Sequence, residues 1–194
     1  MLLPELVAIP ADPPFFLGST AMTNVCYAGF LETGRVAAPP WWNDLDFRSP
    51  RQPVVGVTRN GAMAYCIWLG ESDGGRWRLP TEAEWELAAS AGLPSPRTAW
   101  GDEIPKGEIP EGELRGPWEV GLGTPNGYGL FDMGTIVHEW CFDWDDAPRE
   151  PRRRASRGGS WRHRVRWSAP SARSSLPPDY RYSDYGFRVL KEIR

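Results

Sequence analysis

Glycine and proline are the residues that most limit the fold: the 194 positions hold 21 glycines and 20 prolines, 41 residues in all. Glycine weakens helices and strands and proline interrupts both, so loops should be abundant. Eleven tryptophans indicate short elements held together by large aromatic side chains. The length favours one domain over residues 1–194 with a core of its own.

The expected regular elements are few and short. Thr23 or Asn24 caps a helix that ends near Gly34, and Asn60 caps a second helix that ends at Gly70. Residues 81–84, Thr-Glu-Ala-Glu, form a capping box that begins a third helix, which continues to Gly92. We expect strands at 6–9, 15–17, 54–57, 137–142 and 186–190, and one long irregular excursion over 93–125.

Charge is unevenly distributed along the chain. Residues 102–119 hold six acids and two bases, whereas residues 149–173 hold nine arginines and one acid, Glu150. A nucleic-acid patch is one interpretation. We favour the other, in which the two regions face each other and guanidinium groups stack on aromatic rings. Nucleic acid is therefore not the expected partner.

The cysteines and the N-terminal sequence bear on location. Cys26, Cys66 and Cys141 are far apart, and the last two lie in apolar runs, so we expect free buried thiols without a disulfide framework. Residues 1–14 have no basic start, and prolines interrupt their only apolar stretch. We expect no signal peptide and no membrane span, and hence a cytoplasmic monomer.

The segment Arg157–Arg188 is where a chemical site is expected. It begins with Gly158-Gly159, which lets the backbone pass close to another segment, and it ends with Gly186-Phe187-Arg188. Arginine and aromatic side chains lie between these glycines, and we expect a subset of them to line a ligand cleft. Aromatic walls with guanidinium groups suit an anionic small molecule or a peptide. The expected cleft residues are Trp161, Arg162, Arg166, Trp167, Tyr180 and Tyr182.

Three ordered blocks resemble the formylglycine-generating enzyme (sulfatase-modifying factor) family. They are Arg78–Glu86 (RLPTEAEWE), Asn126–Met133 with His138–Cys141, and Arg157–Trp161 (RGGSW) with Gly186–Arg188. The resemblance covers nearly the whole chain. It implies an α+β fold, a complex variant of the C-type lectin fold with few helices, short strands and much irregular backbone.

The function implied by this resemblance is mixed. Members include copper oxidases that convert a sulfatase cysteine to formylglycine, iron-dependent sulfoxide synthases, and non-catalytic binding proteins, among them retroelement-diversified variable binders. In the oxidases two cysteines follow the RGGSW-like block and hold copper. The matching positions here are His163 and Ser168, and no cysteine follows Cys141. We therefore predict no copper-dependent formylglycine oxidase activity.

Two kinds of function remain open. One is a binding domain for a small molecule, a peptide or another protein. The other is a metal-dependent oxidoreductase of the non-haem iron type that uses His163, with Ser168 as a second candidate catalytic residue. His138 and His163 with Asp143 or Asp184 would suit iron, but no ligand spacing joins the two histidines. For each histidine we favour a hydrogen-bonded position among aromatic side chains.

The resemblance also implies a structural calcium ion at residues 132–139. Asp132 and Glu139 would supply carboxylate oxygens, and Thr135 and Val137 would supply backbone carbonyls, a hard oxygen set that suits Ca²⁺. Alternatively, Asp132 caps a turn and Glu139 pairs with an arginine. Arg188 is expected to be a buried structural arginine that pairs with a carboxylate.

Overall fold

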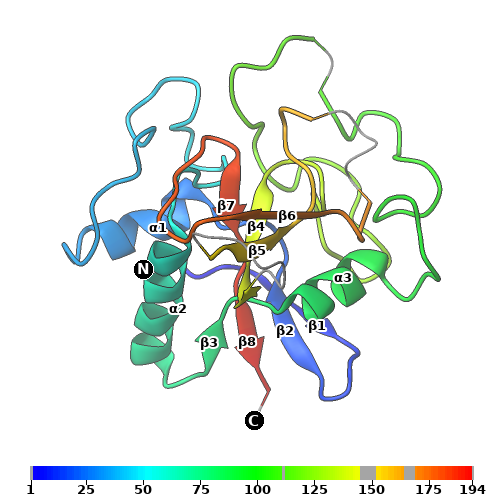
Figure 1. The fold of residues 1–194 in the computed structure, drawn as a ribbon, viewed down its shortest axis with the longest axis horizontal. Coiled ribbons are helices and arrows are strands. Elements are labelled where there is room, and N and C mark those ends of the chain that lie inside the picture. Colours follow the sequence, from blue (N-terminus) through cyan, green and yellow to red (C-terminus); the bar gives the residue numbers. More distant parts are fainter. Residues whose placement is uncertain (1, 111, 145–151, 164–168, 194) are drawn as a thin grey trace.

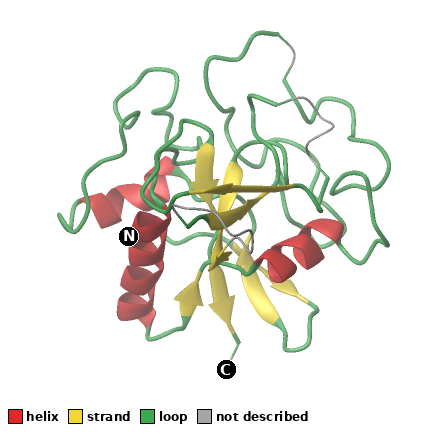
Figure 2. Ribbon diagram, in the orientation of Figure 1, coloured by secondary structure: helices red, strands yellow, loops and turns green. Residues whose placement is uncertain are grey.

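The computed structural model describes residues 2–110, 112–144, 152–163 and 169–193. Within these residues the chain forms three helices and eight short strands, which confirms the expected α+β class. Figure 1 shows the strands at the centre of the molecule, with α2 and α3 on opposite sides of them. Loops make up most of the remaining backbone (Figure 2).

Four strands form the first sheet, in the order β1-β2-β8-β3, and every neighbouring pair is antiparallel. The sheet joins the two ends of the described chain, because β8 lies between β2 and β3. The strands at 6–9 and 15–17 are confirmed. The bounds are β1 Leu6–Ile9, β2 Phe15–Gly18, β3 Trp77–Arg78 and β8 Leu190–Glu192.

The second sheet has the order β6-β5-β4-β7. Its central strand β4 is parallel to β7, with His138 opposite Tyr185, and antiparallel to β5. Residues 138–141 of β4 are all buried, because both faces of the strand are covered. The bounds are β4 His138–Trp144, β5 Arg154–Arg157, β6 Arg173–Leu176 and β7 Tyr185–Phe187.

The three helices begin at hydroxyl caps. Thr23 caps α1 (Asn24–Leu31), and Thr81 with Glu84 forms the expected capping box of α3 (Glu82–Ser90). The expected cap of α2 (Arg59–Asp73) at Asn60 is wrong, because the Thr58 hydroxyl accepts from Gly61 N at 2.9 Å. This helix also continues past Gly70 and ends where Gly74 adopts a left-handed conformation, with φ 68°.

Aromatic side chains fill the core, as the tryptophan content predicts. Tyr27, Phe30 and Tyr65 of α1 and α2 pack on one another, and the two tyrosines also pack on Phe187 of β7, with ring centroids 5.4–6.1 Å apart. Trp85 of α3 and Trp140 of β4 are fully buried. Tightly packed rings of this size stabilise short elements that would be marginal alone.

Two expected strands differ from the structure. Residues 54–57 form no strand, because their amides bond to separate segments: Val54 N to Met22 O, and Gly56 N to the carbonyls of Tyr182 and Tyr185. The expected strand at 186–190 divides into β7 and β8, which belong to different sheets. Arg188 lies in the crossing between them and is fully buried.

The arginine-rich region was expected to face the acidic region 102–119, and among the described residues this is wrong. Arg157 and Arg173 instead form ion pairs with Glu82 of α3. The expected stacking is confirmed, with the guanidinium carbons of Arg152 and Arg154 lying 4.3 and 3.5 Å from the Trp144 ring centroid. Across the described chain, none of the helices has the length and apolarity to span a membrane.

Candidate metal centre

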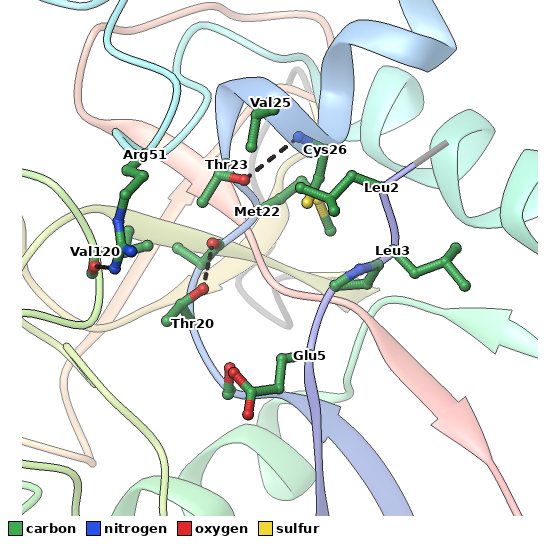
Figure 3. Close-up of a pocket in the computed structure, with 13 residues that line it drawn as sticks. Leu2, Leu3, Glu5, Thr20, Met22, Thr23, Val25, Cys26, Arg51 and Val120 are labelled. Atoms are coloured by element: carbon green, nitrogen blue, oxygen red, sulfur yellow. Dashed lines mark hydrogen bonds between the residues drawn. The ribbon is translucent and has the colours of Figure 1, made fainter.

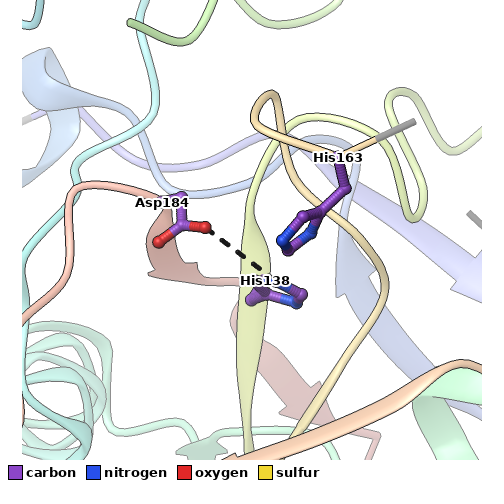
Figure 4. A group of neighbouring side chains, drawn as sticks. All are labelled: His138, His163 and Asp184. Atoms are coloured by element: carbon purple, nitrogen blue, oxygen red, sulfur yellow. Dashed lines mark ion pairs between the residues drawn. The ribbon is translucent and has the colours of Figure 1, made fainter. Parts of the chain in front are cut away.

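Two histidines and one carboxylate meet at one edge of the second sheet. His138 begins β4, Asp184 immediately precedes β7, and His163 follows β5 in a loop. One ligand atom from each of the three side chains lies within 4.8 Å of the others. Figure 4 shows the three side chains pointing toward one another. The fold thus brings together two histidines that no ligand spacing in the sequence joins, and Asp184 is the carboxylate that accompanies them.

Strand register places His138 beside Asp184. Because β4 and β7 are parallel with His138 opposite Tyr185, the residue before Tyr185 lies at the same edge of the sheet as His138. The backbone confirms this, since His138 N donates to Asp184 O at 2.9 Å. The two side chains approach to 4.0 Å between His138 Nε2 and Asp184 Oδ2.

The RGGSW block brings His163 to the same edge. Gly159 N donates to Gly134 O at 2.9 Å and Trp161 N to Ile136 O at 3.0 Å, so this loop follows the segment that enters β4. Gly158 has a φ of 77°, and a Cβ there would lie 2.8 Å from Gly134 Cα. Only glycine fits this close approach, as expected for the Gly-Gly pair.

Hydrogen bonds fix both imidazole tautomers. The Nδ1 atom of His138 lies 2.7 Å from Gly158 O, which only accepts, so Nδ1 carries the proton. The Ser160 hydroxyl donates to Asp184 Oδ2 at 2.9 Å and therefore accepts from His163 Nδ1 at 3.3 Å. Among the described residues, neither Nε2 atom makes a hydrogen bond, so both lone pairs are available. This is the arrangement that orients metal-binding histidines.

Ser160 is a site residue that sequence reasoning missed. Its hydroxyl connects Asp184 to His163 and is 2% exposed. The available signal was its position three residues before His163, in the block that carries the family resemblance.

Burial changes the protonation of the candidate ligands. His138 and Asp184 are buried, while His163 is exposed. Burial lowers the pKa of His138 to about 4, an effect that Asp184 opposes and His163 adds to. Its imidazole is therefore neutral near pH 7, the form that binds metals.

The ligand set suits a divalent transition metal. Two imidazole nitrogens and one carboxylate oxygen bind Fe(II) or Zn(II) and leave coordination positions open. Ligand atoms bonded at about 2.1 Å lie about 3.4 Å apart around a tetrahedral ion and about 3.0 Å apart at adjacent positions of an octahedral ion. The ligand atoms in this structure lie within 4.8 Å of one another, so metal binding requires them to move together by about 1–2 Å. The exposed His163 can supply part of this movement by rotating its side chain.

The residues present do not fit a copper ion held by two thiolates. All three cysteines are free and buried, in α1, α2 and β4. Burial raises the pKa of each thiol, to about 12 for Cys66, so thiolates are disfavoured. At the position matching the first family cysteine the chain carries His163. The second position, Ser168, lies outside the described residues.

In the turn at residues 132–139, the two carboxylates expected to bind calcium accept hydrogen bonds from the protein. Glu139 is fully buried and accepts from Arg188 at 3.0 Å and from Trp85 Nε1 at 2.6 Å, the arginine pairing that the sequence left open. Arg188 is thus a buried structural arginine, as expected. Asp132 Oδ2 accepts from Gly121 N at 2.8 Å. Thr135 and Val137 are buried in the same turn.

The aromatic residues expected to line a cleft lie near the centre. Tyr180 and Tyr182 are exposed, with ring centroids 6.4 Å apart, and the Tyr182 ring lies 6.1 Å from Tyr185. The Tyr185 ring is in turn 4.8 Å from the His138 ring. Trp161 donates from Nε1 to Ser183 O, and the guanidinium of Arg162 lies over its ring. Arg166 and Trp167 lie outside the described residues.

A cavity of about 240 Å³ lies elsewhere, between the N-terminal segment and the start of α1 (Figure 3). No residue of the metal centre lines it. The hydroxyl groups of Thr20 and Thr23 and the Arg51 guanidinium in its wall bond to the protein itself. This cavity thus contributes nothing to the metal centre.

Two curated relatives are similar over most of the chain. One is the serine/threonine-protein kinase pkn1 of Chlamydia pneumoniae, 34% identical over 92% of this chain and 33% of the relative. Another is the formylglycine-generating enzyme of Streptomyces coelicolor, 32% identical over 92% of this chain and 78% of the relative. The chain thus spans about a third of the length of the chlamydial kinase.

Two solved structures share the fold. PvdO from Pseudomonas aeruginosa has a TM-score of 0.78 at 25% identity, covering 97% of this chain and 91% of PvdO. Variable protein 1 of Treponema denticola has a TM-score of 0.77 at 20% identity, covering 98% and 92%. Residues 8–193 match the sulfatase-modifying factor enzyme 1-like domain. The chain therefore belongs to the formylglycine-generating enzyme (sulfatase-modifying factor) family.

Proposed function

We propose that this domain binds its ligand through a divalent transition-metal ion held by His138, His163 and Asp184. The convergence of two imidazole rings and one carboxylate carries the proposal. Three protein ligands leave coordination positions for a ligand or water. Because His163 is exposed and the other two residues are buried, those positions face the surface.

The neighbouring aromatic surface supports a binding role. Tyr180, Tyr182, Trp161 and Arg162 lie on the segments that carry Asp184 and His163. Exposed tyrosines supply contact area at a low cost in conformational entropy, and arginine pairs with carboxylate or phosphate groups. The ligand is accordingly an anionic small molecule or a peptide, and another protein could present the same groups.

A non-haem iron type of oxidoreductase is the second candidate function. The specific observation in its favour is the ligand set, since two histidines and one carboxylate with open positions are typical of iron oxygenases. Bound iron would supply the redox chemistry, and His163 would hold it. The check is oxygen uptake by iron-loaded protein with a cysteine peptide as trial substrate. Uptake that is equal in the His163→Ala variant rejects this function.

The metal proposal is tested on protein purified without a histidine tag and treated with EDTA. Fe(II) under anaerobic conditions, Zn(II) and Co(II) are titrated separately, because intrinsic affinities differ among these metals. We expect one ion per chain, and Co(II) should give a visible absorption band from nitrogen and oxygen ligands. If folded protein retains none of the three metals above the level of a buffer blank, the proposal is contradicted.

Matched variants identify the ligands. His163→Ala should weaken metal binding by more than about 100-fold without unfolding the protein, because His163 is exposed. Asp184→Asn should also weaken binding. Asp143→Asn is the control, since this acid accepts from Glu82 N at 2.6 Å and serves the start of α3. Equal affinity in all three variants would refute the assignment.

A structural calcium ion at residues 132–139 is a separate proposal. Arg188 and Trp85 already engage Glu139, so Asp132 and the carbonyl groups of Thr135 and Val137 would be the remaining ligands. A site with one such carboxylate should bind Ca²⁺ only near millimolar concentration. Calcium should then raise the melting temperature of wild-type protein and not of Asp132→Asn. No shift at 10 mM calcium rejects the site.

Location and assembly are also proposals. The three buried free thiols support a reducing compartment, and we propose a cytoplasmic monomer. Light scattering of purified protein and fractionation of the source cells check these two points.

A further inference from the structure

A second cavity of about 240 Å³ lies at the N-terminal end of α2. It is lined by the first turn of that helix, by Tyr27 and Arg181, and by the apolar side chains of Val36 and Val57. In the cavity of Figure 3 the hydroxyl groups bond to the protein itself, whereas in this one two donors make no hydrogen bond with any described residue. None of the three metal-centre residues lines it.

The Tyr27 hydroxyl is the first such group. Tyr27 is 1% exposed, and its ring stacks on Tyr65 at 5.4 Å between centroids. The Tyr65 hydroxyl donates to Cys26 O, but no hydrogen bond to the Tyr27 hydroxyl exists among the described residues. The Tyr27 oxygen lies at the first turn of α2, 3.7 Å from where a Cβ on Gly61 would be. The Tyr27 oxygen is not among the enclosed polar atoms of the described residues that lack a partner, so it opens onto the cavity and can donate to a molecule there.

The start of α2 supplies a second donor. The Thr58 cap satisfies the amides of Gly61 and Ala62, and Arg59 N donates to Pro178 O. Within the described chain, the Asn60 amide of this first turn has no acceptor. The first turn also contains no acidic residue, so nothing on the helix offsets the partial positive charge of its N-terminal end.

Arg181 adds a full positive charge. Its Nη1 donates to Gly56 O at 3.0 Å, which fixes the guanidinium at the rim of the cavity. Among the described residues no carboxylate lies within ion-pair distance of it. The nearby Asp179 instead accepts from the Asn60 side chain at 3.2 Å.

All three groups donate hydrogen bonds and one is a cation, so they favour a negatively charged acceptor. We propose that this cavity binds an oxyanion, the carboxylate or phosphate group of a small molecule. The Tyr27 hydroxyl, the Asn60 amide and the Arg181 guanidinium donate to it. The apolar wall of Val36 and Val57 contacts its organic part. The site is separate from the metal centre, although Arg181 and Asp184 lie on the same segment before β7.

The test is a titration of wild-type protein at low ionic strength with butyrate and, separately, with inorganic phosphate. Calorimetry and NMR measure the binding. Sodium chloride at matched ionic strength is the control. Tighter binding of butyrate identifies an organic carboxylate, and tighter binding of phosphate identifies a phosphate group; either supports an oxyanion site. No binding of either anion beyond that of chloride overturns the proposal.

Variants locate the site. Arg181→Met and Tyr27→Phe should each weaken anion binding about 10-fold, as expected for losing one hydrogen bond to a charged group. Tyr65→Phe and Arg51→Met are the matched controls, because each removes the same group from a position outside this cavity. His163→Ala should leave the anion affinity unchanged. Unchanged affinity in both Arg181→Met and Tyr27→Phe overturns the assignment.

A stability measurement gives a readout that needs no anion. Removing the partnerless Tyr27 hydroxyl should leave the melting temperature of anion-free protein unchanged or slightly higher. Tyr65→Phe loses a satisfied hydrogen bond and should melt lower. Tyr27→Phe that melts as low as Tyr65→Phe would show that the Tyr27 hydroxyl has a partner in the protein, and would overturn the inference.

Discussion

His138 and Asp184 are held 4.0 Å apart, from Nε2 to Oδ2, by backbone pairing that does not involve their side chains. The bond from His138 N to Asp184 O and the parallel register of β4 and β7 fix the separation. The backbone positions of these two candidate ligands are therefore set by the sheet. The Gly158 carbonyl and the Ser160 hydroxyl, which lie outside this pairing, then orient the two side chains.

Ser160→Ala should weaken metal binding by about 10- to 100-fold, because the hydroxyl orients both Asp184 and His163. Its effect on the free energy of unfolding should be about 1–3 kcal/mol, as for two hydrogen bonds. Calorimetric titration with Zn(II) and urea denaturation measure the two effects. Ser72→Ala, which removes a hydroxyl bonded to Leu69 O on α2, is the control. Equal zinc affinities in the two variants would contradict a positioning role.

Gly158→Ala should destabilise the fold by more than about 2 kcal/mol. Its φ is 77°, and the added Cβ would lie 2.8 Å from Gly134 Cα and 3.2 Å from the Trp85 ring. Gly34→Ala measures the cost of the left-handed backbone conformation alone, since Gly34 has a φ of 69° and a Cβ there would meet no atom within 4 Å. This variant should lose only about 1 kcal/mol of unfolding free energy. Urea denaturation of both variants makes the comparison, and similar losses would refute the close approach.

Arg188→Met should destabilise the protein by about 3–5 kcal/mol, because it leaves the Glu139 carboxylate buried without its cation. Adding Glu139→Gln should restore part of this loss. We expect a coupling energy on the order of 2 kcal/mol from the double-mutant cycle. Additive losses in the cycle would mean that the pair does not act as a unit.

Metal-free protein should lose stability as the pH falls below 6.5. The folded-state pKa of His138 is about 4, lower than its ordinary value of 6.5, so the unfolded chain takes up the proton first. This contribution is fully present above pH 6.5, declines as the pH falls toward 4, and is no more than about 3 kcal/mol. His138→Asn keeps a donor for Gly158 O and cannot titrate. Denaturation from pH 7.5 to 4.5 should therefore show a smaller slope for the variant.

Elements specified by neighbouring residues were predictable from the sequence. The capping box of α3 lies within four residues, and the structure confirms it. The cap of α2 was assigned two residues late, because Thr58 and Asn60 are both suitable cap residues and only the fold selects between them. The run at 54–57 is apolar enough for a strand. Its amides nevertheless bond to two separate segments, which local sequence does not encode.

The candidate site was predictable only in part. The RGGSW block and Gly158-Gly159 predict the segment that carries His163, and the position of His163 in the family pattern makes it a candidate. Its partners come from β4 and from the residue before β7, and strand register brings them together. Register depends on long-range pairing, so no spacing in the sequence reveals it.

The position of β8 between β2 and β3 has a consequence for how the chain folds. β3 ends at Arg78, and its partner begins at Leu190, so more than 100 residues separate the two strands. The first sheet cannot complete its hydrogen bonding until that whole intervening chain has been brought into place. Sheets closed by such distant pairing form slowly, and their open edges are exposed to aggregation in the meantime. Recovery of folded protein after denaturation should accordingly depend more on dilution and time than on the stability of the folded state.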